Sequence, residues 1–345
     1  MSSQPKSVFR LGNISIQWRA RTLVVCASLI CVLVVLGILH IGTGTMSFSP
    51  GEIFNSLFGD ATNPTAERII MRVRLPRLVT AIFVGASLGM AGSIFQSISR
   101  NALGSPDIIG FTTGAATGAI VQIILFNAGP FETALAAVLS GLGTAMIVFL
   151  LALKGRTTGG YRLILIGLGV GAVLSGVNTI LLVAGDLDQA ASAQLWLAGS
   201  LNTRTWSHAI PAVIGFFLVV PIVIYFAQRI SLLEMGDDAA RQLGISVETT
   251  RLAMVLVAVA LTSVATAATG PIAFIALAAP QLVRRLTHAP GVPLIASALM
   301  GAVLLVGADL FAQHFPLNIK MPIGLTTGLL GGLYLLWILY KKNKF

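Results

Sequence analysis

Long apolar stretches with almost no charge dominate the pattern along the chain. Five of them are roughly 20 residues long, which lets a helix cross about 30 Å of hydrocarbon. They are residues 23–42, 132–153, 209–227, 252–269 and 322–340. Lipid offers the backbone no hydrogen-bond partners, so we expect these stretches to be helices. A membrane β-barrel would need strands of about ten alternating residues, and the sequence shows no such alternation.

Further apolar segments bring the expected number of membrane-spanning helices to ten. They are residues 78–98, 108–127, 162–184, 271–286 and 293–312. The segment 271–286 is short and begins at Gly270-Pro271, so we expect it to be bent or partly interfacial. An even number of spans places both termini on one side. The expected fold class is an all-α polytopic membrane protein, with a single transmembrane domain (23–345) after an N-terminal segment (1–22).

Composition also indicates a membrane protein. Of the 345 residues, 56% are hydrophobic and only 10% are charged, whereas about a quarter of the residues in a soluble domain are charged. The first apolar stretch is too long for the core of a signal peptide and has no small-residue cleavage site, so we expect a retained helix. Its two cysteines, Cys26 and Cys31, lie on that one helix and predict no disulfide framework.

The distribution of the basic residues indicates how the bundle is oriented in the membrane. If both termini are cytoplasmic, 16 of the 22 Lys and Arg residues lie on the inner side, where membrane proteins retain positive charge. The net charge of +10 then reflects basic cytoplasmic loops, and we expect no nucleic-acid partner. Six basic residues remain outside, and four of these form an arginine group. They are Arg68, Arg72, Arg74 and Arg77.

Two interpretations of this arginine group stay open. In the first, it binds lipid headgroups or pairs with acidic residues of the same loop, which are Glu52, Asp60 and Glu67. In the second, it receives an acidic partner protein or an anionic solute, because opposite charge steers and orients an approaching partner. The other two outer basic residues are Arg204 and Lys320.

The sequence contains no catalytic constellation, and we expect no cofactor. Its four histidines are scattered without metal-ligand spacing. No Gly-Lys dipeptide occurs, so a phosphate-binding loop is excluded and any ATP hydrolysis requires a separate chain. Asp309 is the one acid expected inside a span, near its outer end. We interpret it as a carboxylate satisfied by a neighbouring polar group rather than as a proton carrier.

Glycines recur at four-residue spacing on several expected helices. They include Gly85 and Gly89, Gly110, Gly114 and Gly118, Gly167 and Gly171, and Gly324, Gly328 and Gly332. This spacing places small residues on one helix face, where backbones approach closely. We interpret most of these glycines as packing contacts, along which helices of a transporter can also slide.

The longest cytoplasmic loop, residues 229–251, has amphipathic spacing. Leu233, Ala240 and Leu243 place apolar side chains amid charges, and Gly244 is expected to end a first short helix. Linkers seldom show such spacing. Apolar residues held in an aqueous loop therefore predict a surface that a partner covers.

This loop carries the first sign of a known family. Asp238 to Gly244, D-A-A-R-Q-L-G, resembles the E-A-A-x-x-x-G coupling motif of ATP-binding-cassette (ABC) importer permeases. Further segments resemble the iron–siderophore and cobalamin permease family (FecCD type), within which the ferric-enterobactin permease subunits are most similar. They are R-L-P-R (74–77), N-A-L-G-S-P-D-I-I-G-F-T-T-G-A (101–115), G-P-I-A-F-I-A-L-A-A-P-Q-L-V-R-R (270–285) and A-D-L-F-A-Q (308–313).

The resemblance implies a type II ABC importer permease in a bacterial inner membrane, with both termini cytoplasmic. It implies four partners: a cytoplasmic ATPase dimer, a periplasmic siderophore-binding protein, an iron–siderophore ligand and a second permease subunit. A homologous second subunit is favoured, and a second copy of this chain is the alternative. Two departures from the family occur. Ala102 stands where the family usually has proline, and Gln281 where it usually has histidine.

The resemblance also assigns roles to residues. The ATPase-coupling residues would be Asp238, Ala239, Ala240, Leu243 and Gly244. Docking of the binding protein would fall to Arg72, Arg74 and Arg77, with Lys320 assisting. Gln96 and Asn101 would be polar groups near the translocation pathway.

The sequence therefore predicts the permease subunit of an importer for an iron–siderophore complex of ferric catecholate type, without an enzymatic site of its own. Cobalamin, haem and hydroxamate siderophores are alternative substrates. Two other classes stay open. An ion-driven secondary transporter would keep its uptake when any ATPase is lost, and a membrane scaffold or receptor would transport nothing.

Overall fold

A computed structural model describes most of the chain. The described residues are 7–11, 14–18, 20–44, 46–59, 63–106, 110–154, 157–158, 160–288, 291–314 and 321–342. Lys320, one of the expected docking residues, and Asp60 lie outside these ranges.

Seven helices in the described ranges are long and apolar enough to cross a membrane, which confirms the predicted helical membrane architecture. Together with α5, α12 and α14, they make ten helices that cover the ten expected spans. They are α1 (Ala20–Gly42), α4 (Leu75–Ser99), α5 (Phe111–Phe126), α6 (Pro130–Ala152), α7 (Gly160–Ala184), α9 (Trp206–Leu233), α11 (Val247–Thr269), α12 (Ile275–Thr287), α13 (Leu294–Gln313) and α14 (Ile323–Lys342). The eighth expected span is short, as predicted, but its helix α12 begins at Ile275 rather than at Pro271 and has 13 residues.

Several shorter elements were not predicted from hydropathy. They are α2 (Pro50–Phe58), α3 (Pro64–Ile69), the π-helix η1 (Ile70–Arg74), α8 (Leu187–Leu197) and the hairpins β1–β2 (Ser7–Leu11, Ile14–Trp18) and β3–β4 (Leu153–Lys154, Thr157–Thr158). Local chemistry explains two of the helices. Ser49 and Glu52 form a reciprocal capping box at the start of α2, and Asp186 and Gln189 do so at α8. The short helix α10 (Asp237–Gln242) was expected.

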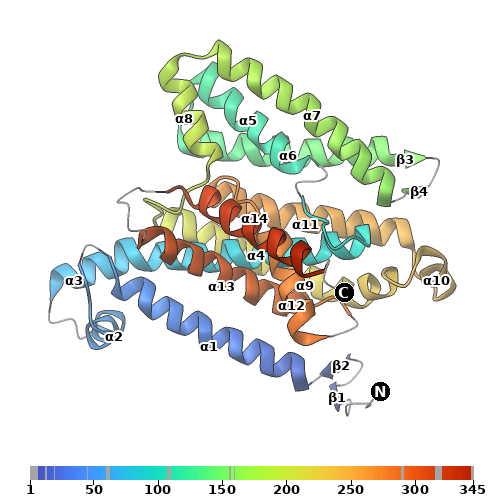
Figure 1. The fold of residues 1–345 in the computed structure, drawn as a ribbon, viewed down its shortest axis with the longest axis horizontal. Helices are drawn as coiled ribbons and strands as arrows, with labels where there is room; N and C mark the ends of the chain where they lie inside the picture. Colours follow the sequence, from blue (N-terminus) through green and yellow to red (C-terminus); the bar gives the residue numbers. More distant parts are fainter. Residues whose placement is uncertain are drawn as a thin grey trace.

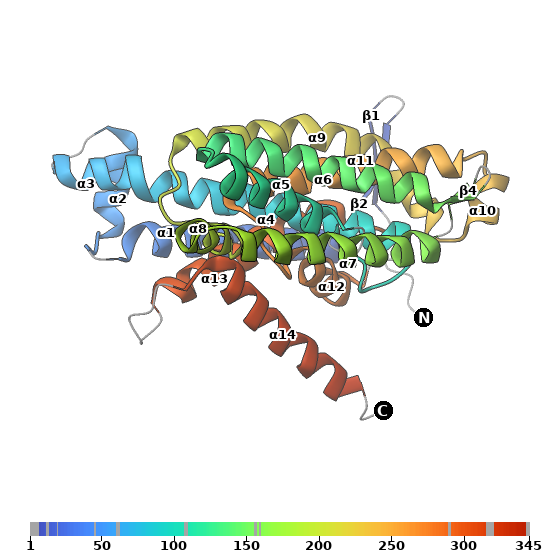
Figure 2. The same ribbon diagram turned by 90° about the horizontal axis from the view of Figure 1, so that it is seen from above.

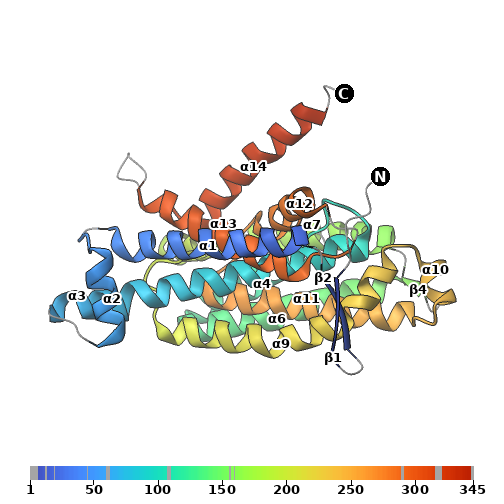
Figure 3. The same ribbon diagram turned by 90° about the horizontal axis from the view of Figure 1, so that it is seen from below.

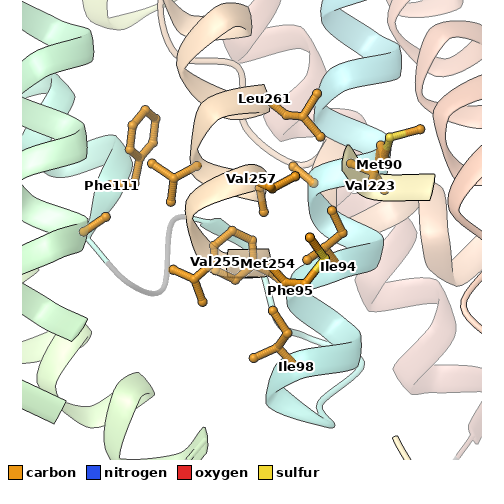
Figure 4. Close-up of a cluster of buried hydrophobic side chains, with 14 of the residues drawn as sticks. Met90, Ile94, Phe95, Ile98, Phe111, Val223, Met254, Val255, Val257 and Leu261 are labelled. Atoms are coloured by element: carbon orange, nitrogen blue, oxygen red, sulfur yellow. The ribbon is translucent and has the colours of Figure 1, made fainter. Parts of the chain in front are cut away.

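α4 forms the centre of the bundle, with α13, α12, α11 and α9 packed around it. The helices α5 to α8 form a separate layer, which rests on the central group through α6 and α11 (Figure 1). α14 contacts α13 near its start and then leans away from the bundle, on the side where α7 lies (Figures 2 and 3). One apolar cluster joins α4 to α11 and includes Ile94, Phe95, Met254 and Leu261 (Figure 4).

Small residues let α4 touch its neighbours backbone to backbone. A Cβ added to Gly89 would lie 2.1 Å from the carbonyl oxygen of Ser297 on α13. A Cβ added to Gly85 would lie 2.4 Å from that of Gly301. These distances are far below van der Waals contact, so only glycine fits at either position. The packing interpretation of the Gly85 and Gly89 spacing is confirmed.

The two ends of the bundle carry different elements. The helices α2 and α3 lie at one end, which we call the outer end in keeping with the charge distribution (Figure 1). The opposite end, which we call the inner end, holds α10, both hairpins and the C-terminal end of α14 (Figure 1). The arginine group and the coupling loop are therefore separated by the full length of α4.

Candidate functional site

The arginine group at the outer end divides into an exposed half and an engaged half. Arg68 on α3 and Arg72 on η1 are exposed. Arg74 and Arg77 point into the chain and are buried and half-buried, respectively. Their backbone lies where the π-helix passes into α4, and such a helix is common at functional positions. The indole of Trp206 donates to the carbonyl of Met71 at 2.9 Å and fixes this segment against α9.

Arg74 fixes the connection between α1 and α2. Its guanidinium donates to the carbonyl oxygens of Ile41 and Met46. It also lies over the ring of Phe48, 4.7 Å from the centroid, where a cation is attracted to the aromatic face. Gly44 passes so close that an added Cβ would lie 2.9 Å from Arg74. The residue expected to dock a partner is therefore occupied within its own chain.

Arg77 pairs with the buried carboxylate of Asp309 on α13. Its Nε and Nη2 donate to the two carboxylate oxygens at 2.8 and 2.7 Å. His40 Nε2 on α1 lies 2.7 Å from Oδ2, and the Gln313 amide donates to the same oxygen at 3.1 Å. The expectation that a polar neighbour satisfies Asp309 is thus confirmed. A carboxylate already accepting from three side chains is poorly placed to carry protons across the membrane.

The outer end also exposes two aromatic rings beside the free arginines. Phe54 and Phe58 on α2 are 60% and 70% exposed, and their centroids are 4.5 Å apart. The helix α2 packs against α3 and η1, which carry Arg68 and Arg72. We call these four residues the outer face. It combines apolar area with positive charge, and so differs from the purely electrostatic site that the arginine pattern suggested.

Two other charged residues at the outer end, Glu52 and Arg204, are engaged within the chain. Hydrogen bonds from the Ser49 amide and then from its hydroxyl lower the pKa of Glu52. Glu52 therefore caps α2 and makes no ion pair with the arginine group in the described ranges. Arg204, another outer basic residue, donates to the Ser200 carbonyl at 3.0 Å, and burial lowers the pKa of its guanidinium.

At the inner end, α10 presents an outward surface built on a small core. Ala240 is fully buried and packs with Leu233 and Val247. The side chain of Asp238 is 93% exposed, and Leu243 is 59% exposed. Of the three apolar residues singled out in this loop, Leu243 is exposed, whereas Leu233 and Ala240 are buried. Among the expected coupling residues, Asp238, Leu243 and Gly244 are exposed, Ala239 is half-buried, and Ala240 supports them from inside.

Gly244 ends α10, as the sequence predicts. Its φ is +79°, in the left-handed region where glycine is favoured. The Ile245 amide donates to the Ala240 carbonyl at 3.0 Å, and Gly244 N donates to Arg241 O at 3.0 Å. The bond from Ile245 is typical of a Schellman cap, which also brings an apolar residue back onto the helix. Ile245 accordingly packs on the cluster that contains Ala240.

A second acid, Asp237, was missed by the sequence reasoning. It precedes the motif residue Asp238 but points inward, and its carboxylate contacts Arg100 at the end of α4 and Arg251 on α11. Helical spacing could have found it, because residues three apart share a face and Asp237 lies three residues before the apolar Ala240. The motif itself drew attention only to Asp238.

The two expected pathway residues have structural roles within this chain. Gln96 is 3% exposed, and its amide donates to Leu277 on α12 at 3.0 Å. Asn101 is exposed and accepts from the Leu103 amide at 2.9 Å, which shapes the loop after α4. The two departures from the family meet in the same loop, since the Gln281 amide donates to the Ala102 carbonyl at 2.8 Å.

The described residues contain no group of three or more His, Cys, Asp or Glu side chains arranged to hold a metal ion. The site is therefore two surfaces at opposite ends of a helical bundle. One is aromatic and basic, and the other is a capped helix with its own small core.

Comparisons with known proteins show which proteins this chain resembles. Residues 32–341 match the FecCD transport family. The chain is 43% identical over 325 residues to the ferric enterobactin transport system permease protein FepG of Escherichia coli K12, covering 94% of this chain and 98% of FepG. It is 33% identical to the probable siderophore transport permease YfhA of Bacillus subtilis, covering 89% and 91%. A solved metal-chelate type ABC transporter in an inward-facing conformation superposes with a TM-score of 0.83 at 29% identity, covering 92% and 99% of the two chains.

Proposed function

Since this chain belongs to the FecCD transport family, we propose that its cargo as a permease subunit of a siderophore ABC importer is a ferric catecholate. The observation that carries the proposal is the 43% identity to a ferric enterobactin permease over 94% of the chain. The segments that resemble enterobactin permeases include residues 104–111 and 232–238. Cobalamin, haem and hydroxamate siderophores are the competing cargoes.

An ATPase pair binds the outward surface of α10. The supporting observation is the exposure of Asp238 and Leu243 above a buried Ala240. A short helix with its own core presents a fixed shape, and an exposed apolar side chain beside charges suits a partner better than solvent. ATP binding and hydrolysis in these partners would move α10 and change the access of the pathway.

A periplasmic siderophore-binding protein docks on the outer face. Arg72 is the main contact among the expected docking residues, and Arg68 stands beside it. Arg74 and Arg77 shape this face from below, since their guanidinium groups are held by Ile41, Met46 and Asp309. Positive charge on the permease would meet acidic groups on the binding protein, which favours fast and oriented association. Lys320 stays a proposed assistant.

A second, homologous permease subunit packs against α7 and α14. Four glycines on these helices have open space where a Cβ would point: Gly169 and Gly176 on α7, and Gly328 and Gly332 on α14. Small residues that meet nothing in their own chain suit close approach by another helix. α14 also leans out of the bundle on the side of α7 (Figure 2). The central pathway would lie between the two subunits.

Both termini face the cytoplasm of a bacterial cell whose inner membrane holds the chain. The β1–β2 hairpin and the end of α14 lie at the same end as α10 (Figure 1). The excess of Lys and Arg at that end supports its cytoplasmic placement.

Competition for uptake tests the cargo. Cells that lack their own enterobactin permease would receive this chain together with its partner subunits, and uptake of radio-iron-loaded enterobactin would be measured. Unlabelled ferric catecholate should compete, whereas a ferric hydroxamate or cobalamin should not. Cells that import a labelled ferric hydroxamate, haem or cobalamin but no labelled ferric enterobactin would assign the permease to that cargo instead.

A further inference from the structure

Asp237 joins three elements at the inner end of the bundle. It is the first residue of α10, and its carboxylate accepts from Arg100, which caps the C-terminus of α4. It also accepts from Arg251 on α11, whose Nη2 lies 2.9 and 3.0 Å from the two carboxylate oxygens. One acid is thus held between two arginines that belong to different membrane helices.

The cluster is buried at Arg251 and open to water at Arg100, whose side chain is 42% exposed. The Arg251 side chain is 3% exposed and that of Asp237 is 28% exposed. Arg251 also donates to Glu248 at 3.1 Å, so the formal charges of Arg100, Arg251, Asp237 and Glu248 cancel. Ion pairs away from solvent are weakly screened and sensitive to the loss of one partner. The Arg251–Asp237 pair therefore differs from the pair that Arg241 makes with Asp238, in which both side chains are exposed.

Arg100 directs α4 toward α10. Its backbone adopts φ 48° and ψ 33°, a left-handed cap, and its amide donates to the carbonyls of Gln96 and Ser97. A residue other than glycine in this conformation is held there by its surroundings. The cap ends the helix at Arg100, and the Arg100 guanidinium pairs with the Asp237 carboxylate. The ion pair and the cap together fix the orientation of the end of α4 relative to α10.

The same end of α4 is joined to α12. The Gln281 amide donates to Ala102 at 2.8 Å, one residue beyond Asn101 in the loop after α4. Gln96, one turn before the end of α4, donates to Leu277 at 3.0 Å. Arg284 on α12 pairs in turn with Glu234 at the end of α9 at 2.5 Å. A displacement of Arg100 would therefore reach α12 through hydrogen bonds rather than through loose apolar contacts.

The other end of α4 continues into the outer face. Through η1 it is continuous with Arg72, and Arg77 in its first turn is fixed to Asp309 on α13. Glycine contacts hold α4 close to α13 along the way. α4 is linked to its neighbours at both ends and packs on α13 through backbone contacts. We therefore expect it to move as a rigid body.

We propose that Asp237 is a positioning residue that transmits the movement of α10 to α4 through Arg100. The proposal rests on the proposed function, in which an ATPase pair moves α10. Asp238 would contact the ATPase, while its neighbour Asp237 conveys the displacement into the membrane. α4 then links the state of the ATPase to the outer face, where the binding protein docks.

The test uses the complete importer in proteoliposomes, with its ATPase, its second permease subunit and a binding protein loaded with ferric enterobactin. Uptake and ATP hydrolysis are measured together, and the readout is the amount of iron imported per ATP hydrolysed. The variants are Asp237→Asn, Arg100→Gln, the double variant and the charge-conserving Asp237→Glu. The matched control is Asp188→Asn, which removes one charge from an exposed aspartate on α8.

We expect Asp237→Asn and Arg100→Gln each to lower this ratio about five-fold or more. The double variant should be no worse than the worse single variant, because the two residues act through one contact. Asp237→Glu should restore most of the ratio, and the control should keep it. A wild-type ratio in Asp237→Asn would overturn the proposal, as would single losses that multiply in the double variant.

A purely structural role has a different signature. It would lower the melting temperature of the complex and its content of ATPase subunits, with iron imported per ATP unchanged, and that result would also overturn the proposal. Failure of the proposed function is distinct, because wild-type vesicles would then import no ferric enterobactin. Imported iron in the wild type with equal ratios in all variants would reject only the role of Asp237.

Discussion

The guanidinium of Arg77 and the carboxylate of Asp309 form a two-point ion pair at the outer end of the bundle, with nitrogen–oxygen distances of 2.8 and 2.7 Å. The residues are 232 positions apart in sequence, and the pair joins α4 to α13. The Asp309 side chain is 2% exposed, whereas that of Arg77 is 21% exposed. The ion pair with Arg77 therefore offsets the free-energy cost of burying the Asp309 carboxylate.

Replacing Arg77 should destabilise the fold before it affects docking. Arg77→Ala leaves a buried carboxylate with only His40 and Gln313 as donors, and breaking such a pair costs about 3 kcal/mol or more. Thermal unfolding of the purified chain in detergent measures this loss. The double variant Arg77→Met/Asp309→Leu should recover most of the stability, since it leaves no unpaired charge. A single variant as stable as the wild type would contradict the structural role.

Arg72 should govern docking without affecting stability. Its side chain is exposed, so Arg72→Glu reverses a charge on the outer face and removes no contact within the described chain. We expect the association rate of the siderophore-binding protein to fall about tenfold at low salt, with a smaller effect at high salt. The measurement is binding kinetics on the immobilised importer.

Arg285→Glu is the matched control for this experiment, because it reverses an exposed charge at the inner end. Its association rate should equal that of the wild type. Equal slowing by both variants would mean that only the total charge of the permease acts. Unchanged kinetics in Arg72→Glu would remove Arg72 from the docking surface.

At position 244, the left-handed backbone conformation should decide which substitutions are tolerated, and the size of the new side chain should not. An added Cβ meets nothing within 4 Å, but φ is +79°. Gly244→Asn should retain most coupling, because asparagine enters the left-handed region at little cost, whereas a β-branched residue resists it. We expect Gly244→Val to destabilise the cap by about 1–2 kcal/mol. Binding-protein-stimulated ATP hydrolysis distinguishes the two variants, and equal activity would argue against the Schellman cap as the functional feature.

Replacing glycine by alanine should destabilise the subunit on α4 but not on α14. Gly89→Ala places a methyl group 2.1 Å from the Ser297 carbonyl and must separate α4 from α13. We expect a loss of stability of about 2 kcal/mol or more from this overpacking. Gly332→Ala fills open space in this chain and should leave the stability of the subunit unchanged.

Cross-linking of the two permease subunits completes this comparison. If α14 packs on a partner subunit, Gly332→Ala should weaken their association while the subunit alone stays folded. Undiminished association in Gly332→Ala would place the partner elsewhere. Undiminished stability in Gly89→Ala would contradict the backbone contact between α4 and α13.

The membrane spans could be predicted from the sequence, because a long apolar stretch is itself what drives a helix to insert into a membrane. The Asp309 cluster was predictable only in part. The sequence indicated that Asp309 needs a polar partner, but His40 and Arg77 lie far away in sequence and only tertiary packing brings them there. The split of the arginine group also escaped prediction, since the register of η1 decides that Arg72 points outward and Arg74 inward.

The inner end shows the same limit. A motif at 238–244 located α10, but the motif gave no direction for Asp237, whose partners Arg100 and Arg251 come from other helices. Hydropathy does not reveal the short helices α2 and α8, although the residues of their capping boxes are present in the sequence.

The most direct test of the account asks what drives transport. Uptake of radio-iron-loaded enterobactin would be measured in spheroplasts that express this chain with its partners and receive the purified binding protein, once with an active ATPase and once with an ATPase inactivated in its phosphate-binding lysine. A parallel sample would receive an ionophore that collapses the proton and sodium gradients while ATP is maintained. The account predicts that uptake is lost with the inactive ATPase and persists with the ionophore. Uptake that survives ATPase inactivation and stops with the ionophore would contradict it and identify an ion-driven carrier.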